Sequence, residues 1–266
     1  MQLKDNNSIS AIIITHNEEI NIEKCLKSIS WVDEIIILDS YSTDETPEIA
    51  KKYTKNIYFH KFENNFSNLR NLAIKYAKGD WILTIDSDES LPRNAELIIR
   101  KLVLNSKTEG FWFPRRNYID DKNYLKYGYF YPDFQLRLFK NHRQIKYSGI
   151  IHEQPLIDKE KTKTISNLEI YHNNTHTKYN SLFSFNRFYP YIKIEGKYKA
   201  SHEKNVIFLI MNGFKEIVNN LHKSFIKCRG YKDGYIGFKA AFLHSLYLGT
   251  ISFYAAFIRL KRDYDL

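Results

Sequence analysis

The chain has 266 residues, a formal net charge of +10 and an aromatic content of 15%. This length allows one substantial hydrophobic core, or one core with an appendage. The two cysteines, Cys25 and Cys228, exclude a disulfide framework and a zinc site built from cysteines. The basic, aromatic composition is compatible with nucleic acid, anionic lipid headgroups or a phosphorylated glycan as partner, and charge alone does not choose among them.

The first half of the chain alternates between apolar runs and amphipathic stretches. Apolar runs that predict buried strands lie at 10–15, 34–39, 56–60 and 80–86. Amphipathic stretches that predict helices lie at 17–30, 42–53 and 67–79. Strands that are apolar throughout and alternate with helices indicate a parallel sheet covered on both faces. We therefore predict an α/β, doubly wound, mostly parallel nucleotide-binding sheet, with its ligand at the carboxyl ends of the strands.

The pattern changes at about Gly110, where shorter strands in mixed pairing are separated by tyrosine-rich loops. From about Asn180 onward the sequence is helical in character. We predict an α/β domain over residues 1–178, divided at about residue 108, and a helical region over 179–266.

One uncharged segment, Ala240–Ile258, is flanked by lysine and arginine and is close to the minimum length of a membrane span. Polar residues interrupt it, and its tyrosines lie in its middle rather than at its ends. Three interpretations stay open: a membrane span, a packed helix of the domain, and a helix that lies in the membrane interface.

The N-terminal residues are polar and lack the apolar run of a signal peptide. We therefore expect a cytoplasmic protein, with both cysteines as free thiols in a reducing environment.

Polar residues follow the first two predicted strands. The rim that they form contains Thr15, Asn17, Glu18, Asp39, Ser42 and Asp44. Asp39 ends its strand, where a carboxylate can accept hydrogen bonds from the N–H of a base or from ribose hydroxyls. The alternative is that Ser42 and Asp44 only cap the following helix. The sequence has neither a GxGxxG nor a GxxxxGK[ST] motif, so a Rossmann dinucleotide site and a P-loop are not supported.

The fourth strand runs into the acidic stretch IDSDE, residues 85–89. Residues two apart on an extended chain point the same way, so Asp86 and Asp88 could share one divalent cation that also touches phosphate. We expect such a cation to offset the repulsion among these carboxylates. Arg70, on the preceding helix, could hold the aspartates or a diphosphate by paired hydrogen bonds, or could form an ordinary surface pair.

Several stretches, taken in order, resemble family 2 glycosyltransferases with the GT-A fold. They are SAIIITHNEEINIEKCLKSI, EIIILDSYSTDET, NLRNLAIKYAKGDWILTIDSDE, YPDFQLRLFK and GIIHE, and they span residues 10–153. The resemblance is closest to cytoplasmic enzymes that add β-linked glucose to the inner core of lipopolysaccharide. It implies a nucleotide-sugar half at about 1–108 and an acceptor half at about 109–178. Ser40 and Tyr41 depart from the commoner DDGSTD form, which leaves the identity of the nucleotide open.

The resemblance also implies roles for individual residues. Asp39 would read the uracil of a UDP-sugar, with Thr15 and Asn17 lining the nucleotide. Asp86 and Asp88 would be the D-x-D pair that holds Mn²⁺ or Mg²⁺ against the diphosphate. His152 would complete the metal coordination or contact the diphosphate, although a lone histidine is more often structural.

An inverting transfer also needs a base that takes the proton of the acceptor hydroxyl. By resemblance this base is Asp133, and the alternative is a turn residue after Pro132. Arg137 alternates with hydrophobic residues along its strand and is expected to face the donor phosphates. Arg115 and Arg116 are further candidates for contact with the donor.

The sequence thus predicts a metal-dependent inverting glycosyltransferase. It would move a hexose, glucose, from a UDP-sugar to a lipid-linked saccharide such as the inner core of lipopolysaccharide, at the anionic inner leaflet of the cytoplasmic membrane. A polyprenyl-linked or other surface glycan is the alternative acceptor. A nucleotidyltransferase would need a glycine-rich basic signature that the chain lacks near its N-terminus. A nucleic-acid-binding protein is the remaining class, and we expect no nucleic-acid partner.

Overall fold

The computed structural model describes residues 7–104, 107–120, 122–142, 145–151, 153–173 and 188–263. The chain divides into two compact units. The α/β unit consists of Met1–Arg115 and Asp133–Asn173. The helical unit consists of Arg116–Pro132 and Asn174–Leu266, so a tyrosine-rich loop of the predicted α/β domain belongs with the helices.

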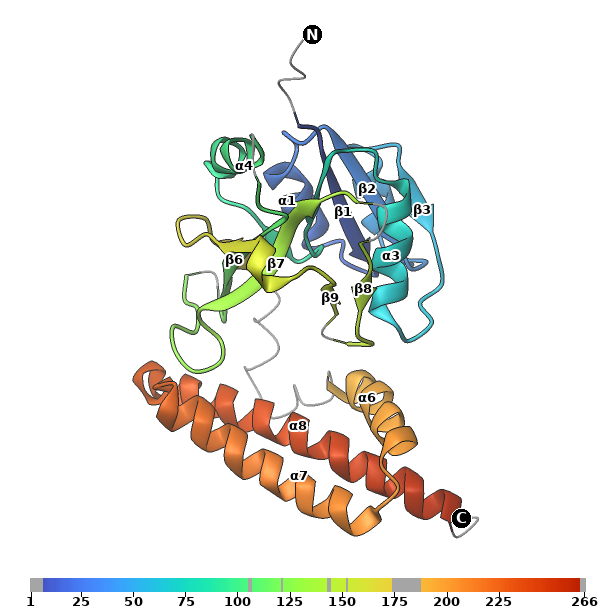
Figure 1. The fold of residues 1–266 in the computed structure, drawn as a ribbon, viewed down its shortest axis with the longest axis vertical. Helices are drawn as coiled ribbons and strands as arrows, with labels where there is room; N and C mark the ends of the chain where they lie inside the picture. The colour runs from blue at the N-terminus through green and yellow to red at the C-terminus, as the bar shows by residue number, and fades with distance from the viewer. Residues whose placement is uncertain are drawn as a thin grey trace. The chain divides into compact units, whose positions relative to one another are not determined.

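The first four strands of the α/β unit form a parallel sheet in the order β3-β2-β1-β4. Their bounds are Ile9–Thr15 for β1, Glu34–Asp39 for β2, Ile57–Phe59 for β3 and Trp81–Thr84 for β4. Figure 1 labels β3, β2 and β1 side by side. The last residues of β1 and β2, Thr15 and Asp39, lie opposite each other in the register. This arrangement confirms the predicted doubly wound sheet and brings the carboxyl ends of its strands to one edge.

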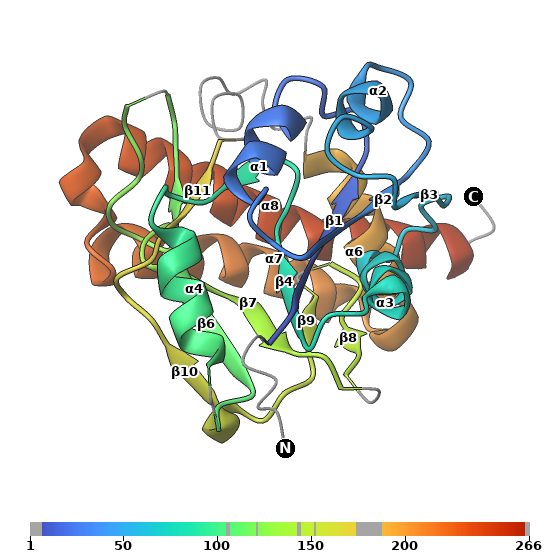
Figure 2. The same cartoon turned by 90° about the horizontal axis from the view of Figure 1, so that it is seen from above.

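Both faces of this sheet are covered. The helices are α1 (Ile22–Ser28), α2 (Thr46–Ala50), α3 (Phe66–Tyr76) and α4 (Ala95–Val103). Alternate residues of β1 point to opposite faces, so Ala11 and Ile13 pack with α1, α2 and α4, whereas Ile12 packs with α3. Figure 2 shows α1 and α4 on one side of β1 and α3 on the other. Both cysteines are free thiols, and Cys25 is buried in α1.

The second half of the α/β unit is mostly antiparallel. Its strands are β5 (Glu89–Ser90), β6 (Gly110–Asn117), β7 (Asp133–Lys140), β8 (Tyr147–Ser148), β9 (Gln154–Pro155), β10 (Thr162–Thr164) and β11 (Ile170–His172). A 3₁₀ turn, η1 (Lys159–Lys161), precedes β10. Strand β7 joins β4 to β6, and β11 pairs with β5. Residues far along the chain therefore lie beside the acidic stretch that follows β4.

The helical unit contains α6 (Tyr189–His202), α7 (Val206–Leu221) and α8 (Gly234–Asp263), with a π-helical turn at His222–Lys227 and a 3₁₀ turn at Gly230–Asp233. Helices α7 and α8 run side by side (Figure 1). Glycines make this approach possible. A Cβ atom on Gly249 would lie 2.7 Å from the carbonyl oxygen of Gly213, and one on Gly213 would lie 2.3 Å from the ring of Phe253.

The segment Ala240–Ile258 lies within α8. Among the described residues, one helical stretch, Gly230–Arg262, is long and apolar enough to cross a membrane by length and composition, and half of its most apolar window is buried. Its polar residues have partners inside the unit. Ser252 Oγ accepts hydrogen bonds from Lys199 Nζ at 2.7 Å and from Asn212 Nδ2 at 3.2 Å. These contacts favour the packed helix among the interpretations that the sequence leaves open.

Candidate active site

The loops that follow β1 and β2 are tied together by side chains of the predicted rim. Asn17 has a left-handed backbone conformation, with φ 53°, and its side-chain oxygen accepts a hydrogen bond from Thr43 N at 2.8 Å. Ser42 Oγ accepts a hydrogen bond from Asn17 N and donates one to Asp39 Oδ2, at 2.9 and 2.7 Å. Asp39 Oδ1 accepts a third from Ser42 N at 2.6 Å. Ser42 therefore orients the buried Asp39 carboxylate.

The loop after β1 makes further contacts, with the loop after β2 and with the first residue of α2. Glu18 N donates to Thr46 Oγ1 at 2.7 Å, and Glu19 N donates to Asp44 Oδ2 at 3.1 Å. Asp44 Oδ1 also accepts a hydrogen bond from Thr46 N. Asp44 thus has a local turn role as well as a role between the loops. The side chains form a fixed rim at the edge of the sheet where the predicted ligand would lie.

Thr15 lies at the end of β1 and is 5% exposed. Its Oγ1 atom is buried without a hydrogen-bond partner among the described residues. A buried hydroxyl without a partner costs stability, and such groups in native proteins often meet a ligand or an ordered water. Thr15 therefore offers a free donor directly beside Asp39.

The acidic stretch after β4 is neutralised by arginines. Asp86 Oδ1 accepts a hydrogen bond from Arg70 Nη2, and Asp86 Oδ2 accepts one from Arg137 Nη2, both at 2.6 Å. Burial by itself raises the pKa of the Asp86 carboxyl, but the positive charges of Arg137 and Arg70 outweigh this effect and hold its pKa well below the usual range. In the structure these arginine side chains offset the repulsion that we expected a cation to relieve.

The ion pairs continue from Asp86 to Asp133. Glu89 Oε1 accepts from Arg137 Nη2 at 2.6 Å and from Arg115 Nη1 at 3.0 Å. Arg115 also donates from Nε and Nη2 to Asp133 Oδ2, at 2.8 and 2.7 Å. The side chains therefore form a chain of alternating charge, Asp86–Arg137–Glu89–Arg115–Asp133.

Asp133 is the first residue of β7 and lies opposite Arg115 of β6 in the register. Its Oδ1 atom accepts a hydrogen bond from Gln135 Nε2 at 2.6 Å. Both oxygens of this carboxylate are thus oriented by neighbours, while the side chain keeps 21% of its surface exposed. The residue can meet a ligand at the surface in a fixed orientation.

Asp88 has a different partner from Asp86. Its Oδ2 atom lies 3.2 Å from Nε2 of His172, the last residue of β11. Both side chains are nearly buried, at 11% and 8% exposed. A carboxylate and an imidazole side by side are two ligands that Mn²⁺ accepts, and Mg²⁺ is held in proteins by one or two carboxylates together with substrate phosphates. The described residues contain no cluster of three or more such ligands, and the predicted ligand His152 lies outside them.

Two arginine nitrogens at the site also lack partners. Arg70 Nη1 and Arg137 Nε are buried and make no hydrogen bond with the described residues. Arg70 Nε meanwhile donates to Glu153 Oε1 at 2.6 Å. Guanidinium groups donate to phosphate oxygens through several N–H groups at once. The free donors lie on the two arginines that hold Asp86, where a diphosphate beside the acidic stretch would meet them.

The structure adds site residues to the prediction. The sequence did not predict His172 as a site residue, and it assigned Glu89 no role. Arg115 and Glu153 contact the site residues Asp133 and Arg70, whereas Arg116 stacks over the ring of Tyr124 in the helical unit, 4.7 Å from its centroid. The sequence signal for His172 was a polar residue at the end of a short apolar stretch.

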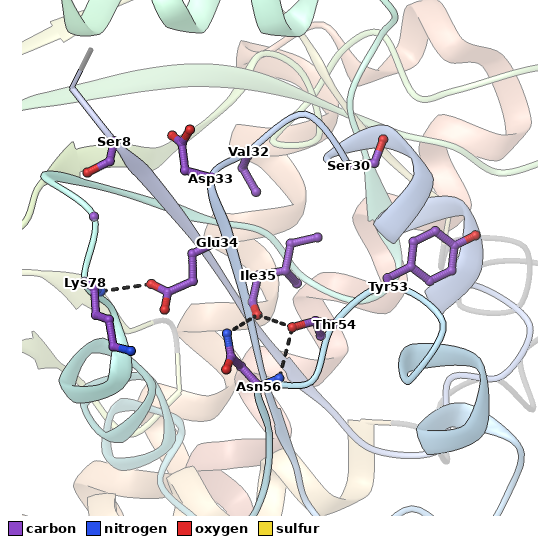
Figure 3. A pocket seen from close by; sticks show the side chains of 11 residues that line it. Ser8, Ser30, Val32, Asp33, Glu34, Ile35, Tyr53, Thr54, Asn56 and Lys78 are labelled. Carbon is purple, nitrogen blue, oxygen red and sulfur yellow. Dashed lines mark hydrogen bonds between the residues drawn. The ribbon is translucent and has the colours of Figure 1, made fainter. Parts of the chain in front are cut away.

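A separate hollow of about 480 Å³ lies near the amino ends of β1 and β2 (Figure 3). Glu34, on its wall, accepts hydrogen bonds from Lys78 N and Ser10 Oγ, and Asp33 accepts from Arg100. The carboxylates of Glu34 and Asp33 thus already have hydrogen-bond partners within the chain. The hollow lies at the opposite end of the strands from the candidate site, so its lining residues are not part of that site.

Comparisons with known proteins identify the family of the chain. The family model described as "Glycosyl transferase family 2" matches residues 10–165. The chain is 33% identical over 188 residues to the glycosyltransferase SunS of Bacillus subtilis, a match that covers 69% of this chain and 43% of that protein. It is 30% identical over 126 residues to the lipopolysaccharide core biosynthesis glycosyltransferase LpsC of Rhizobium meliloti, covering 46% of this chain and 45% of that protein.

The chain thus spans less than half the length of these relatives. Among solved structures, S. aureus TarS 1–349 in complex with UDP-GlcNAc is 14% identical, with a TM-score of 0.46, covering 96% of this chain and 91% of that chain. The predicted family and fold class are confirmed by the family match, which covers more than half of the chain, and by the observed sheet. This protein belongs to glycosyl transferase family 2.

Proposed function

We propose that this protein is a metal-dependent inverting glycosyltransferase that moves a hexose, glucose, from a UDP-sugar to a lipid-linked saccharide such as the inner core of lipopolysaccharide. Membership of the family supports sugar transfer. The observation that carries the donor site is the set of buried donors without partners, Thr15 Oγ1, Arg70 Nη1 and Arg137 Nε, at the carboxyl edge of the parallel sheet. A nucleotide diphosphate would supply the missing acceptors.

The donor would lie along this edge. Asp39, oriented by Ser42, would accept a hydrogen bond from the N–H of uracil. Asn17 and Glu18 would line the nucleotide from the loop after β1. The diphosphate would then lie against Arg70 and Arg137, whose free N–H groups would donate to its oxygens.

Asp88 and His172 are the residues best placed to hold Mn²⁺ or Mg²⁺, because their ligand atoms are 3.2 Å apart and nearly buried. Asp86 and His152 complete the set that the family resemblance implies. Both oxygens of Asp86 accept hydrogen bonds from arginines, so we assign it chiefly to orienting Arg70 and Arg137. When bound, the cation would supply positive charge that stabilises the departing diphosphate.

Asp133 would act as the general base. It would take the proton of the acceptor hydroxyl as that oxygen bonds to the anomeric carbon and the bond from that carbon to the phosphate oxygen breaks. The electron pair of the broken bond leaves with UDP. Arg115 and Gln135 would hold the carboxylate in a fixed orientation, since they donate to its two oxygens.

The acceptor assignment has separate support. The name of LpsC places that relative in lipopolysaccharide core biosynthesis. A lipid-linked acceptor would put this enzyme on the cytoplasmic face of the membrane as a peripheral protein, and the net charge of +10 suits its anionic inner leaflet. A polyprenyl-linked or other surface glycan, with a different sugar donor, is the alternative.

The test is UDP release from a panel of UDP-sugars, with detergent-solubilised truncated glycolipid as acceptor and Mn²⁺ or Mg²⁺ present. Wild type is compared with Asp88→Asn and with Asp158→Asn, a control carboxylate on the exposed surface. We expect UDP-glucose to be the best donor, Asp88→Asn to lose turnover and Asp158→Asn to keep it. Equal turnover of all three proteins without added metal would refute the metal assignment. Salt-sensitive retention on DNA without stabilisation by UDP and Mn²⁺ would instead favour a nucleic-acid-binding protein.

A further inference from the structure

The outer face of α7 is apolar and exposed. Its core is formed by Ile207, Met211, Phe214 and Val218, which are 70%, 67%, 62% and 66% exposed. Their spacing of four, three and four residues places them in one stripe along the helix. We call this stripe, widened on its flanks by the exposed Phe208 and Ile210, the outer face of α7.

The opposite side of α7 already packs within the helical unit. Leu209 is fully buried with Ala255 and Ala256 of α8. Gly213 lies against Phe253 and Gly249. Of the outer face, Phe214 contacts Phe253 of α8 edge to face, with ring centroids 5.0 Å apart, and still keeps 62% of its surface exposed. A helix that packs through one side and exposes a continuous apolar stripe on another has a surface that marks contact with a partner or with lipid.

The positive charge around this face favours an anionic partner. Residues 188–263 carry thirteen lysines and arginines against five acidic residues, so most of the net charge of +10 lies in the helical unit. Exposed lysines occur beside the outer face and beyond its ends, at Lys204, Lys215, Lys223 and Lys227. An apolar face bordered by lysines is the pattern of a helix that lies in the interface of an anionic bilayer.

We propose that the outer face of α7 binds the surface of an anionic membrane, with its apolar side chains among the lipid headgroups and its lysines on lipid phosphates. A second copy of this chain is a poorer occupant, because pairing two such units would bring two strongly positive surfaces together. This inference deepens the proposed function and rests on it for its purpose, which is to bring the enzyme to a lipid-linked acceptor. It assigns lipid contact to α7 rather than to the apolar segment of α8.

The test is co-sedimentation of the full chain with vesicles of phosphatidylcholine alone or in equal parts with phosphatidylglycerol. We expect binding to the anionic vesicles only, and weaker binding at high salt. The variant Ile207→Ser/Met211→Ser should lose about tenfold or more in affinity, because two apolar side chains no longer leave water. The matched control is Leu97→Ser/Leu104→Ser, which removes two exposed leucines at α4 and should bind as wild type does.

A second measurement does not depend on weakened binding. In a Cys228→Ser background, Met211→Cys or Leu97→Cys carries an environment-sensitive fluorophore, and the anionic vesicles should shift its emission to the blue at position 211 and not at position 97. Equal responses at both positions, or equal binding of both serine variants, would overturn the inference. So would a concentration-dependent dimer of wild type that the α7 variant abolishes, because the face would then join two copies.

Failure of this inference differs from failure of the proposed function. A wild-type protein that binds UDP and releases it with solubilised acceptor, but ignores anionic vesicles, overturns the membrane surface alone. A wild-type protein that binds the vesicles through α7 but binds no UDP overturns the proposed transfer and leaves the surface standing. UDP affinity without vesicles should be the same in wild type and in the α7 variant, because α7 contributes none of the donor-site residues.

Discussion

Arg137 holds Asp86 by a hydrogen bond of 2.6 Å from Nη2 to Oδ2, and the same nitrogen lies 2.6 Å from Glu89 Oε1. The guanidinium is 7% exposed and the Glu89 side chain is fully buried. Removing one member of such a buried ion pair leaves an uncompensated charge in a medium of low dielectric constant.

We therefore expect Arg137→Met to lower the free energy of unfolding by about 3–5 kcal/mol. Denaturant unfolding followed by circular dichroism measures this change. Lys163→Met, which removes an exposed cation from strand β10, should cost less than about 0.5 kcal/mol. Equal costs for the two variants would mean that the buried ion pairs do not stabilise the fold.

Thr15 and Thr84 offer a matched pair of buried threonines in neighbouring strands. Thr15 Oγ1 has no partner among the described residues, whereas Thr84 Oγ1 accepts a hydrogen bond from Tyr147 at 3.2 Å. Thr15→Val should therefore leave the stability of the free protein unchanged or raise it, and Thr84→Val should lower it by about 1–3 kcal/mol. If Thr15 binds the nucleotide, Thr15→Val should also weaken UDP binding about tenfold in titration calorimetry. A stable Thr15→Val variant with unchanged UDP affinity would remove Thr15 from the donor site.

The depressed pKa of Asp86 predicts how stability depends on pH. Its folded pKa lies below the unfolded value of about 3.9, so the carboxylate contributes stability above that pH and loses its contribution as the pH falls through the folded pKa. The difference in unfolding free energy between wild type and Asp86→Asn should thus be constant above about pH 5 and should shrink in stronger acid. Urea unfolding at a series of pH values measures it, with the exposed Asp158→Asn as control. A difference that grows on acidification would contradict the assignment of this charge.

Asp133→Asn tests the base that the proposed function requires. Asparagine keeps the shape of the side chain but cannot take the acceptor proton, so turnover should fall by about 10²–10⁴-fold. UDP affinity should stay unchanged, since Asp133 is not among the donor-site residues. Single-turnover UDP release and titration calorimetry with UDP separate the two effects. Turnover within a few-fold of wild type would assign the proton to another group.

The parallel half of the fold follows from the sequence because its strands are apolar throughout. The run at 34–39 matches β2 residue by residue. The helix predicted at 17–30 begins only at Ile22 in the structure. Asn17 instead contacts Thr43 in the loop after β2, and Glu18 contacts Thr46, the first residue of α2. Helix α4 is missing from the prediction, although Ala95, Ile99 and Val103 have helical spacing and are buried.

The candidate site was harder to predict where it depends on contacts between distant segments. The positions of Asp39, Asp86 and Asp88 at the edge of the sheet could be predicted, because Asp39 ends a recognisable strand and the other two follow one. His172 reaches Asp88 across 84 residues, through β11, a strand of three residues that pairs with a strand of two. Periodicity does not reveal such short pairings. Nor does it reveal that Arg115 and Arg137 contact the acidic stretch, because the pattern of charges along a chain does not state which opposite charges meet. The contact of Arg70 with the aspartates, by contrast, was predicted, and its hydrogen bond to Asp86 confirms it.

The close approach of Gly213 and Gly249 has a consequence for how the helical unit could change. Alanine at Gly213 would place a methyl group against the Phe253 ring, so α7 would have to shift away from α8 or turn about its own axis. A turn would carry Ile207 and Met211 away from their present direction without altering either residue. The lack of a side chain at Gly213, on the packed side of α7, thus determines which side chains of α7 face outward.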